Sequence, residues 1–324
     1  SGPVTNEADL DVTGAMTLTG ALVNSATGVL DIGAAVAMGA NAVTNDGTMN
    51  VLAAGTVTTT GGVTNTATMD VDGTVDGSVT NAAGAGLNLA GTITGDLGNS
   101  GTTVVDGAAS VNGTTTNAST GTFTVNAGQS LTTPTLTNSG SFTLNGDLLG
   151  GTAITNSLAS GVFSLGAASS ITAADTLLNQ GGASFSMAAG STAGFTGSIN
   201  SPVDGIAGSV VNTGTGSTVT VGGALTAASG VVNESSATMA VSGGGTINGD
   251  VTNSSSAGLD IDGTVAGNVT NQTSGTVSHS GTITGNLSNL VTGVTTVDGA
   301  AAVNGTTDNA GTLTVNAGNT LTTP

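Results

Sequence analysis

Residues 246–299 read TINGDVTNSSSAGLDIDG, TVAGNVTNQTSGTVSHSG and TITGNLSNLVTGVTTVDG, which are three consecutive blocks of about 18 residues each. Residues 56–91 contain two earlier blocks of the same length, TVTTTGGVTNTATMDVDG and TVDGSVTNAAGAGLNLAG. Blocks of this size that repeat in tandem are the signature of a solenoid, in which each repeat forms one coil and packs only on its neighbours.

The Asn that ends the V-T-N element extends this period over the whole chain. Most of its intervals lie between about 16 and about 23 residues, within the range of solenoid repeats. The interval from Asn179 to Asn212 is longer, at about 33 residues, and predicts an additional distorted coil near Phe195. The repeats therefore predict about 17 coils of roughly 18–21 residues, with an irregular coil at 180–211. The recurring residues are Asn6, Asn24, Asn45, Asn65, Asn81, Asn99, Asn117, Asn138, Asn156, Asn179, Asn212, Asn233, Asn253, Asn271, Asn289 and Asn309.

A longer period overlies the coils. Residues 103–134 return in modified form as residues 295–324, and Pro134 and Pro324 end the two copies. The chain thus contains a superunit of about 190 residues, or about ten coils, whose second copy starts near 190–212. We expect residues 1–324 to form a single continuous solenoid and to be an excerpt from a longer tandem array.

Alternation within a coil indicates strands. Val75, Gly77 and Val79 alternate with polar residues, which places them on one inward face. Asn81 is in phase with Val79 and is expected to point inward at a corner, where its amide can bond to the backbone. Leu87 and Leu89 alternate in the same way after a Gly/Ala turn. The pattern predicts an all-β, parallel β-solenoid with two or three short strands per coil at a spacing of about 4.8 Å.

Equivalent positions should form columns along the core. One inward column is expected to contain Leu10, Leu30, Met49, Met69 and Leu87, then the aromatic stack Phe123, Phe142, Phe163 and Phe185, and then Met239, Leu259, Val277 and Leu313.

Composition excludes several functions. The chain has no Lys or Arg, 19 Asp and Glu, no Cys and a formal net charge of −19. Nothing in it can replace the counterions of a nucleic acid or attract an anionic membrane. Disulfides are impossible, so packing and hydrogen bonds must supply the stability.

The acidic residues are the candidates for a metal site. Asp11, Asp31, Asn50, Asp70 and Asn88 are predicted to occupy one outward position on successive coils, and Asp260 is the second copy of Asp70. Stacked carboxylates either remain a solvated stripe or recruit a cation, and oxygen ligands suit Ca²⁺. Weak Ca²⁺ binding is one hypothesis, and no other cofactor is expected. Its ligands would be Asp11, Asp31, Asp70, Asp72, Asp260 and Asp262.

Catalytic groups are few. His279 is the one His, and its phase places it inward like Leu89, so we interpret it as a core residue. No nucleophile–base arrangement stands out, and a polysaccharide lyase would need basic residues that this chain lacks. No enzymatic activity is expected. N-x-Ser/Thr sequons occur by composition alone, among them those at Asn112, Asn117, Asn233, Asn253, Asn271 and Asn304.

The pattern GxVTNxGxLxVxG, present as GSVTNAAGAGLNLAG and GTTDNAGTLTVNAG, resembles the passenger domains of bacterial autotransporters and filamentous-haemagglutinin-like adhesins. The resemblance implies a right-handed β-solenoid, secretion across an outer membrane, and a role in adhesion or biofilms. From the residues alone, a left-handed solenoid remains open. The sequence favours a structural extracellular fibre or adhesin shaft at the bacterial cell surface, which associates with further copies or tandem repeats of itself. A cation- or carbohydrate-binding adhesive module, with surface carbohydrate as partner, is the alternative.

Overall fold

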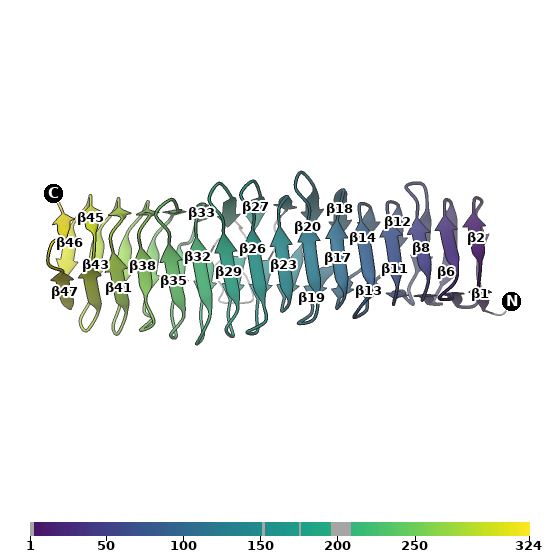
Figure 1. Ribbon diagram of the computed structural model, residues 1–324, viewed down its shortest axis with the longest axis horizontal. Helices are drawn as coiled ribbons and strands as arrows, with labels where there is room; N and C mark the ends of the chain where they lie inside the picture. Colours follow the sequence, from purple (N-terminus) through teal and green to yellow (C-terminus); the bar gives the residue numbers. More distant parts are fainter. Residues whose placement is uncertain (1–2, 151–152, 175, 196–208) are drawn as a thin grey trace. The chain divides into compact units, whose positions relative to one another are not determined.

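The computed structural model describes the chain except for residues 1–2, 151–152, 175 and 196–208. The strands group into two compact units, Ser1–Gly150 and Gly151–Pro324. Each unit is a parallel β-solenoid whose coils contribute one strand to each of three sheets, named A, B and C in chain order (Figure 1). The predicted fold class is therefore confirmed, and each coil has three strands.

In the first unit, the described residues form eight strands in each sheet. Sheet A contains β1 (Val4–Asn6), β4 (Leu22–Asn24), β7 (Val43–Asn45), β10 (Val63–Asn65), β13 (Val79–Asn81), β16 (Leu97–Asn99), β19 (Thr114–Asn117) and β22 (Thr135–Asn138). Sheet B contains β2 (Asp9–Val12), β5 (Val29–Ile32), β8 (Thr48–Val51), β11 (Thr68–Val71), β14 (Gly86–Leu89), β17 (Thr102–Val105), β20 (Thr122–Val125) and β23 (Ser141–Leu144). Sheet C contains β3 (Met16–Thr17), β6 (Ala35–Gly39), β9 (Thr56–Thr59), β12 (Thr74–Asp76), β15 (Thr92–Ile93), β18 (Ala108–Val111), β21 (Ser130–Thr132) and β24 (Asp147–Leu149).

The described residues of the second unit likewise form eight strands per sheet. Sheet A contains β25 (Ala153–Asn156), β28 (Thr176–Asn179), β31 (Val210–Asn212), β34 (Val231–Asn233), β37 (Val251–Asn253), β40 (Val269–Asn271), β43 (Leu287–Asn289) and β46 (Thr307–Asn309). Sheet B contains β26 (Val162–Leu165), β29 (Ser184–Met187), β32 (Thr218–Val221), β35 (Thr238–Val241), β38 (Leu259–Ile261), β41 (Thr276–His279), β44 (Val294–Val297) and β47 (Thr312–Val315). Sheet C contains β27 (Ser170–Ala174), β30 (Thr192–Phe195), β33 (Ala224–Ala227), β36 (Thr246–Asn248), β39 (Thr264–Val265), β42 (Thr282–Ile283), β45 (Ala300–Val303) and β48 (Thr320–Thr322).

Short strands arise because turn residues interrupt each alternating run. Gly77 and Ser78 separate β12 from β13, so the run 75–79 that the alternation predicts as one strand is bent at a corner. On both sides of this corner the apolar residues Val75 and Val79 are buried, whereas Asp76, Ser78 and Thr80 are exposed. The chain therefore turns between sheets C and A without changing its inward face.

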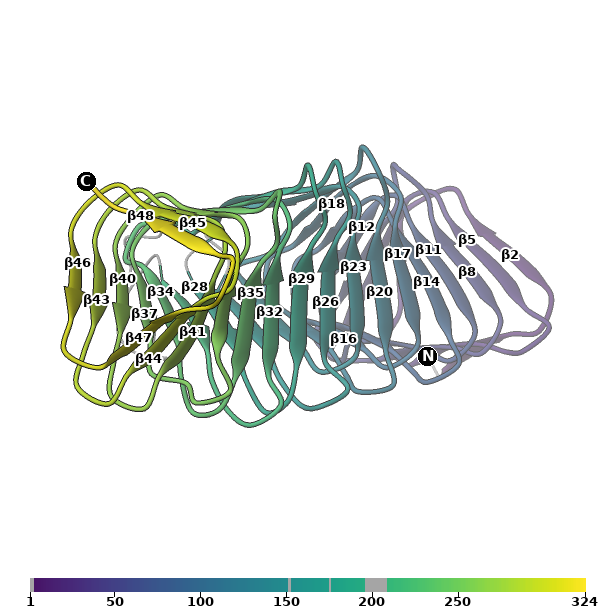
Figure 2. The same ribbon diagram turned by 60° about the vertical axis from the view of Figure 1, so that its left-hand side comes forward.

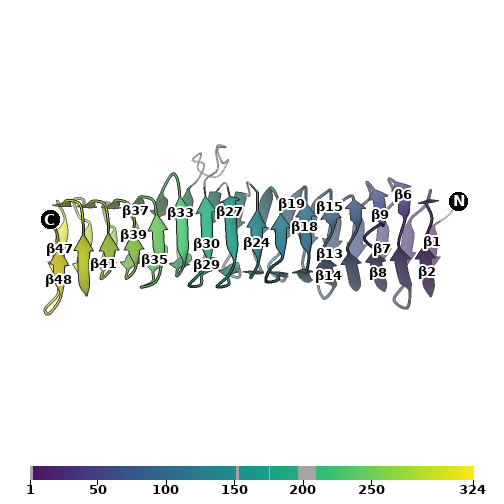
Figure 3. The ribbon, with the colours of Figure 1, turned by 90° about the horizontal axis from the view of Figure 1, so that it is seen from above.

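Equivalent residues pair directly from coil to coil. In sheet A, Val63 pairs with Val79 and Asn65 with Asn81, both in parallel register. Figure 2 shows successive strands such as β8, β11 and β14 of sheet B next to one another, and Figure 3 shows β15 and β18 of sheet C side by side. Within each unit, equivalent residues of successive repeats therefore stack on one another along the solenoid axis.

The predicted core columns are present in both units, with interruptions that the sequence interpretation omitted. Leu10, Leu30, Met49, Met69 and Leu87 form consecutive pairs. Buried Thr103 separates Leu87 from Phe123, and Val219 follows Phe185. Ring centroids are 5.0 Å apart between Phe123 and Phe142 and 5.5 Å apart between Phe163 and Phe185. The aromatic rings therefore stack on neighbouring coils of their own unit.

The prediction of an additional coil between Asn179 and Asn212 is wrong. These two residues pair directly in β28 and β31, and the coil that joins them contains only β29 and β30 besides. The extra length lies between β30 and β31, where residues 196–208, including Pro202, are outside the described part of the chain. The described residues accordingly form sixteen coils, eight in each unit, where the intervals predicted about 17.

For the same reason, one superunit contains one coil fewer than the sequence intervals predict. Its equivalent residues Asn81 and Asn271 lie on β13 and β40, which are nine strands apart in the order of sheet A. One superunit of sequence therefore corresponds to nine coils, where the intervals predicted about ten.

Candidate functional site

A row of Asn side chains lines the corner between sheets A and B. In the first unit, each Nδ2 donates to Oδ1 of the next Asn at 2.7–2.9 Å, from Asn6 to Asn138. In the second unit, the same bonds run from Asn156 to Asn309 at 2.7–3.0 Å. Each bond joins consecutive coils, so the amides form a polar column inside an apolar core.

The Nδ2 donors of these bonds also have a second acceptor. The amide of Asn81, for example, donates to the carbonyl oxygen of Thr102 on the next coil at 2.9 Å, besides its bond to Asn99. Both amide protons are thereby used, which compensates the burial of a polar group. The column has a direction, because the donor always lies on the coil nearer the N-terminus.

A second column, which the sequence interpretation missed, lies at the exposed corner between sheets C and A. Asp96 Oδ1 accepts a hydrogen bond from the Thr114 N–H at 2.8 Å. Asp250 accepts from the Asn268 N–H at 2.8 Å, and Asn268 accepts from the Asn286 N–H at 2.9 Å. The sequence signal is a polar residue after Gly and before the sheet A strand, as in Gly249-Asp250-Val251.

The predicted acidic stripe of the first unit has the expected register. Asp11 pairs with Asp31, Asp31 with Asn50, and Asn50 with Asp70. The Asn50 amide donates to Asp31 at 2.6 Å. Burial raises the pKa of Asp70, and the carboxylates of Asp72 and Asp106 raise it further. The neutral Asn residues thus separate Asp70 from the other members of its own column.

Asp260 lies in a different column environment in the second unit. Its neighbours on the adjacent coils are Ala240 and Ser278. Burial raises the pKa of Asp260, as do the carboxylates of Asp262 and Asp298, while the nearby Ser278 side chain and the Ile261 backbone oppose this rise. Asp262 accepts a hydrogen bond from the Ser280 hydroxyl.

In the part of the chain that the structure describes, no three His, Cys, Asp or Glu side chains come together in a way that could hold a metal ion. Calcium binding by Asp11, Asp31, Asp70, Asp72, Asp260 and Asp262 remains a prediction, as does the alternative of a solvated acidic stripe.

The described residues also contain no helix that is long and apolar enough to cross a membrane.

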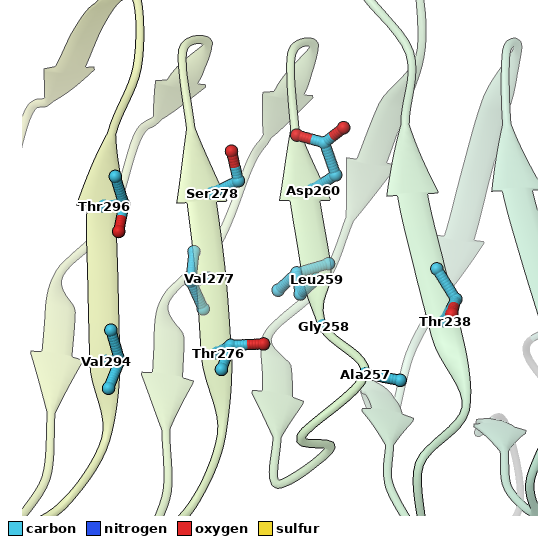
Figure 4. A pocket seen from close by; sticks show the side chains of 10 residues that line it. All are labelled: Thr238, Ala257, Gly258, Leu259, Asp260, Thr276, Val277, Ser278, Val294 and Thr296. Atoms are coloured by element: carbon cyan, nitrogen blue, oxygen red, sulfur yellow. The ribbon is translucent and has the colours of Figure 1, made fainter. Parts of the chain in front are cut away.

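A groove of about 430 Å³ opens on the outer face of sheet B in the second unit. Figure 4 shows its lining residues on β35, β38, β41 and β44 and in the segment that leads into β38. Strand β38 begins only at Leu259, and the preceding Gly258 adds no side chain, so the outer surface is lowered there. Asp260, Thr276, Ser278 and Thr296 supply oxygen atoms to the groove, and Val294 supplies an exposed apolar edge.

His279 is fully buried, as its phase predicts, and pairs with Ile261 and Val297 in sheet B. Of the sequon residues, Asn117, Asn233, Asn253 and Asn271 are buried in the amide column. Asn112 and Asn304 are exposed, and both follow a sheet C strand. Two further sequons, which begin at Asn268 and Asn286, are also exposed, just before a sheet A strand. The four sequons of the amide column are inaccessible to glycosylation in the folded chain.

No protein-family model and no curated protein sequence matches this chain. Among solved structures, it is similar to the crystal structure of a TibC-catalysed, hyper-glycosylated fragment of TibA, residues 55–350. The two chains are 14% identical, the match covers 96% of this chain and 100% of that chain, and the TM-score is 0.39.

Proposed function

We propose that this chain is the shaft segment of an extracellular bacterial surface fibre or adhesin, and that it supplies length, stiffness and an inert surface. The observation that carries this proposal is the in-register stacking of coils within each unit, in which each described coil repeats the same strand pairs and the same Asn bond. Such a stack grows by adding coils without changing its cross-section.

The direction of the amide column supports association with further copies or tandem repeats. A coil that joins the stack after an Asn donor has to present an amide oxygen at the same corner. The two edges of a parallel stack are different, so copies would associate head to tail and not through a two-fold axis. Another V-T-N coil, from the same chain or from a second copy, fits this requirement.

The inert surface is consistent with the absence of catalytic activity that we expect. The chain has no Lys or Arg, and neutral residues separate Asp70 and Asp260 from other carboxylates of their own columns. The resemblance of the GxVTNxGxLxVxG pattern to autotransporter passengers and filamentous adhesins supports secretion to the cell surface.

Electron microscopy of native material tests the shaft. Nine coils at about 4.8 Å predict fibres with an axial repeat of about 43 Å, which corresponds to one superunit. Globular particles without axial order would contradict the proposal.

A second candidate is a cation- or carbohydrate-binding adhesive module, favoured by the groove beside Asp260. Its hydroxyl and carboxylate oxygens can form hydrogen bonds with a hydroxyl-rich ligand. Phe123, Phe142, Phe163 and Phe185 are buried, so none of these four rings can stack on a sugar. Titration with oligosaccharides and with Ca²⁺, in the wild-type chain and in Asp260→Ala, distinguishes the candidates. Binding that the substitution abolishes supports the module, and an unchanged melting temperature after addition of Ca²⁺ or a chelator argues against a cation site.

A further inference from the structure

His279 is the one basic side chain in the sequence, and it occupies an apolar column. It lies on β41 with an exposed fraction of 0%. Its partners in the column, Ile261 on β38 and Val297 on β44, are also fully buried. Its ring is therefore surrounded along the stack by side chains that cannot bond to it.

Neither ring nitrogen has a hydrogen-bond partner. Among the described residues, four buried side-chain polar atoms lack a partner, and Nδ1 and Nε2 of His279 are two of them. Burial lowers the pKa of His279. This effect is opposed by the nearby backbone of Ala302 and Ile261 and by the Asp298 carboxylate, none of which forms a hydrogen bond with the ring. The folded coil therefore favours the neutral form of the His279 ring.

The ionisable groups near His279 are all carboxylates outside the core. Asp260 lies on β38 and Asp262 directly follows it. Asp298 follows β44 and accepts a hydrogen bond from the Ser278 hydroxyl. The strands β40, β43, β42 and β45 of sheets A and C contain no ionisable residue. A charged ring has no buried partner, but three carboxylates lie at the surface of the two adjacent coils.

We propose that His279 is an acid-sensitive switch, and that protonation of its ring releases β41 from its place between β38 and β44. An unpaired charge is disfavoured in an apolar core, whereas an opened coil lets the imidazolium reach water and the carboxylates of Asp262 and Asp298. The formal net charge of −19 favours a cation at the surface of this chain. The shaft then has one coil that opens first when the surroundings become acidic.

The repeat supplies the control for this proposal. The equivalent residue in the first copy of the superunit is Leu89, which is buried at the corresponding place on β14. The variant His279→Leu therefore restores the residue of the other copy and leaves every carboxylate unchanged. A second variant, His279→Gln, keeps a polar side chain that does not titrate.

Hydrogen exchange measured by mass spectrometry between about pH 8 and pH 5, corrected for intrinsic exchange rates, tests the switch. Because the pKa in the opened coil is near the ordinary 6.5, opening of residues 269–297 should increase up to about tenfold per pH unit below that value. Residues 79–105 around Leu89 should show no such increase, and His279→Leu and His279→Gln should abolish it. Equal acid responses in the wild-type chain and in both variants would overturn the proposal.

Nuclear magnetic resonance gives an independent readout, since a single His yields a single imidazole signal. The ring should titrate below the ordinary His value, together with exchange broadening of residues in β41. A ring that titrates at its ordinary value without any change in β41 would also overturn the switch.

Discussion

Asparagine is the residue on which the stacking of coils depends, because its amide donates two hydrogen bonds and accepts others. In Asn81 one proton bonds to Asn99 and the other to the carbonyl of Thr102, while Oδ1 accepts from Asn65. Leu or Val at this corner would fill the space, but the Asn65 amide would lose its acceptor and the Asn99 amide oxygen its amide donor.

Replacement of Asn81 by Ala should lower the free energy of unfolding by about 1–3 kcal/mol, because buried groups on both neighbouring coils each lose one hydrogen bond. Asn88→Ala is the matched control, since Asn88 lies in the same coil with an exposed side chain. Chemical denaturation measures both variants, and equal losses would show that the amide column does not stabilise the stack.

Whereas the amide column stabilises the folded chain, the ionised carboxylate of Asp70 destabilises it. The pKa of Asp70 is raised, so its ionised form is less favourable in the folded chain than in the unfolded chain. Stability should therefore fall as pH rises through the range above the ordinary value of 3.8, and acidification to that range should restore it.

Asp70→Asn should raise the melting temperature at neutral pH, because the uncharged amide continues the Asn50 and Asn88 column and removes the repulsion from Asp72 and Asp106. Below the ordinary carboxyl pKa, the variant and the wild-type chain should melt together. Asp76→Asn serves as control, because Asp76 is exposed and accepts a hydrogen bond from Thr94. A variant that melts lower at neutral pH would contradict this assignment.

At the scale of the element, the turn between sheets A and B has to leave room for the amide column. A Cβ on Gly121 would lie 2.3 Å from Asn117 Oδ1 and 2.7 Å from the Asn99 carbonyl oxygen. Gly28 and Gly275 meet their own Asn neighbours at the same distance of 2.3 Å. The Asn-x-x-x-Gly spacing is therefore a packing requirement of the corner.

Gly121→Ala should destabilise the chain by about 1–3 kcal/mol, because the new methyl group displaces a buried hydrogen-bonded amide. Gly98→Ala should be neutral or stabilising, since a Cβ there meets no atom within 4 Å and glycine weakens a strand interior. Thermal unfolding of the two variants checks the pair, and similar shifts for both would contradict the steric account.

The period of the sequence predicted the strands, their register and the inward columns, because residues such as Met49 and Met69 repeat their type at equivalent places. It did not reveal the corner column, because Ser78, Asp96 and Asn268 differ in type and their donors or acceptors are backbone groups. Interval length also could not distinguish an additional coil from extra residues between two strands of one coil. The groove depends on where β38 begins, which the alternation of apolar residues does not determine.

At the scale of the whole molecule, the chain combines a repeated core with a surface that has one sign of charge. Two strand spacings of about 4.8 Å separate next-nearest coils, and only adjacent coils are in contact. Stability in such a stack is nearly a sum of identical interfaces, so the account depends on adjacent coils lying in register.

The chain has no Cys, which allows a direct test of that register. Thr64 and Thr80 are exposed, pair on β10 and β13, and should be about 4.8 Å apart at Cα, within the range of about 4.4–6.8 Å in which disulfides form. The double variant Thr64→Cys/Thr80→Cys should therefore form an intrachain disulfide on mild oxidation. Thr44→Cys/Thr80→Cys, whose positions lie two coils apart across β10, should not form one. Efficient crosslinking of the second pair and none of the first would contradict in-register stacking, on which the fold and the proposed shaft both depend.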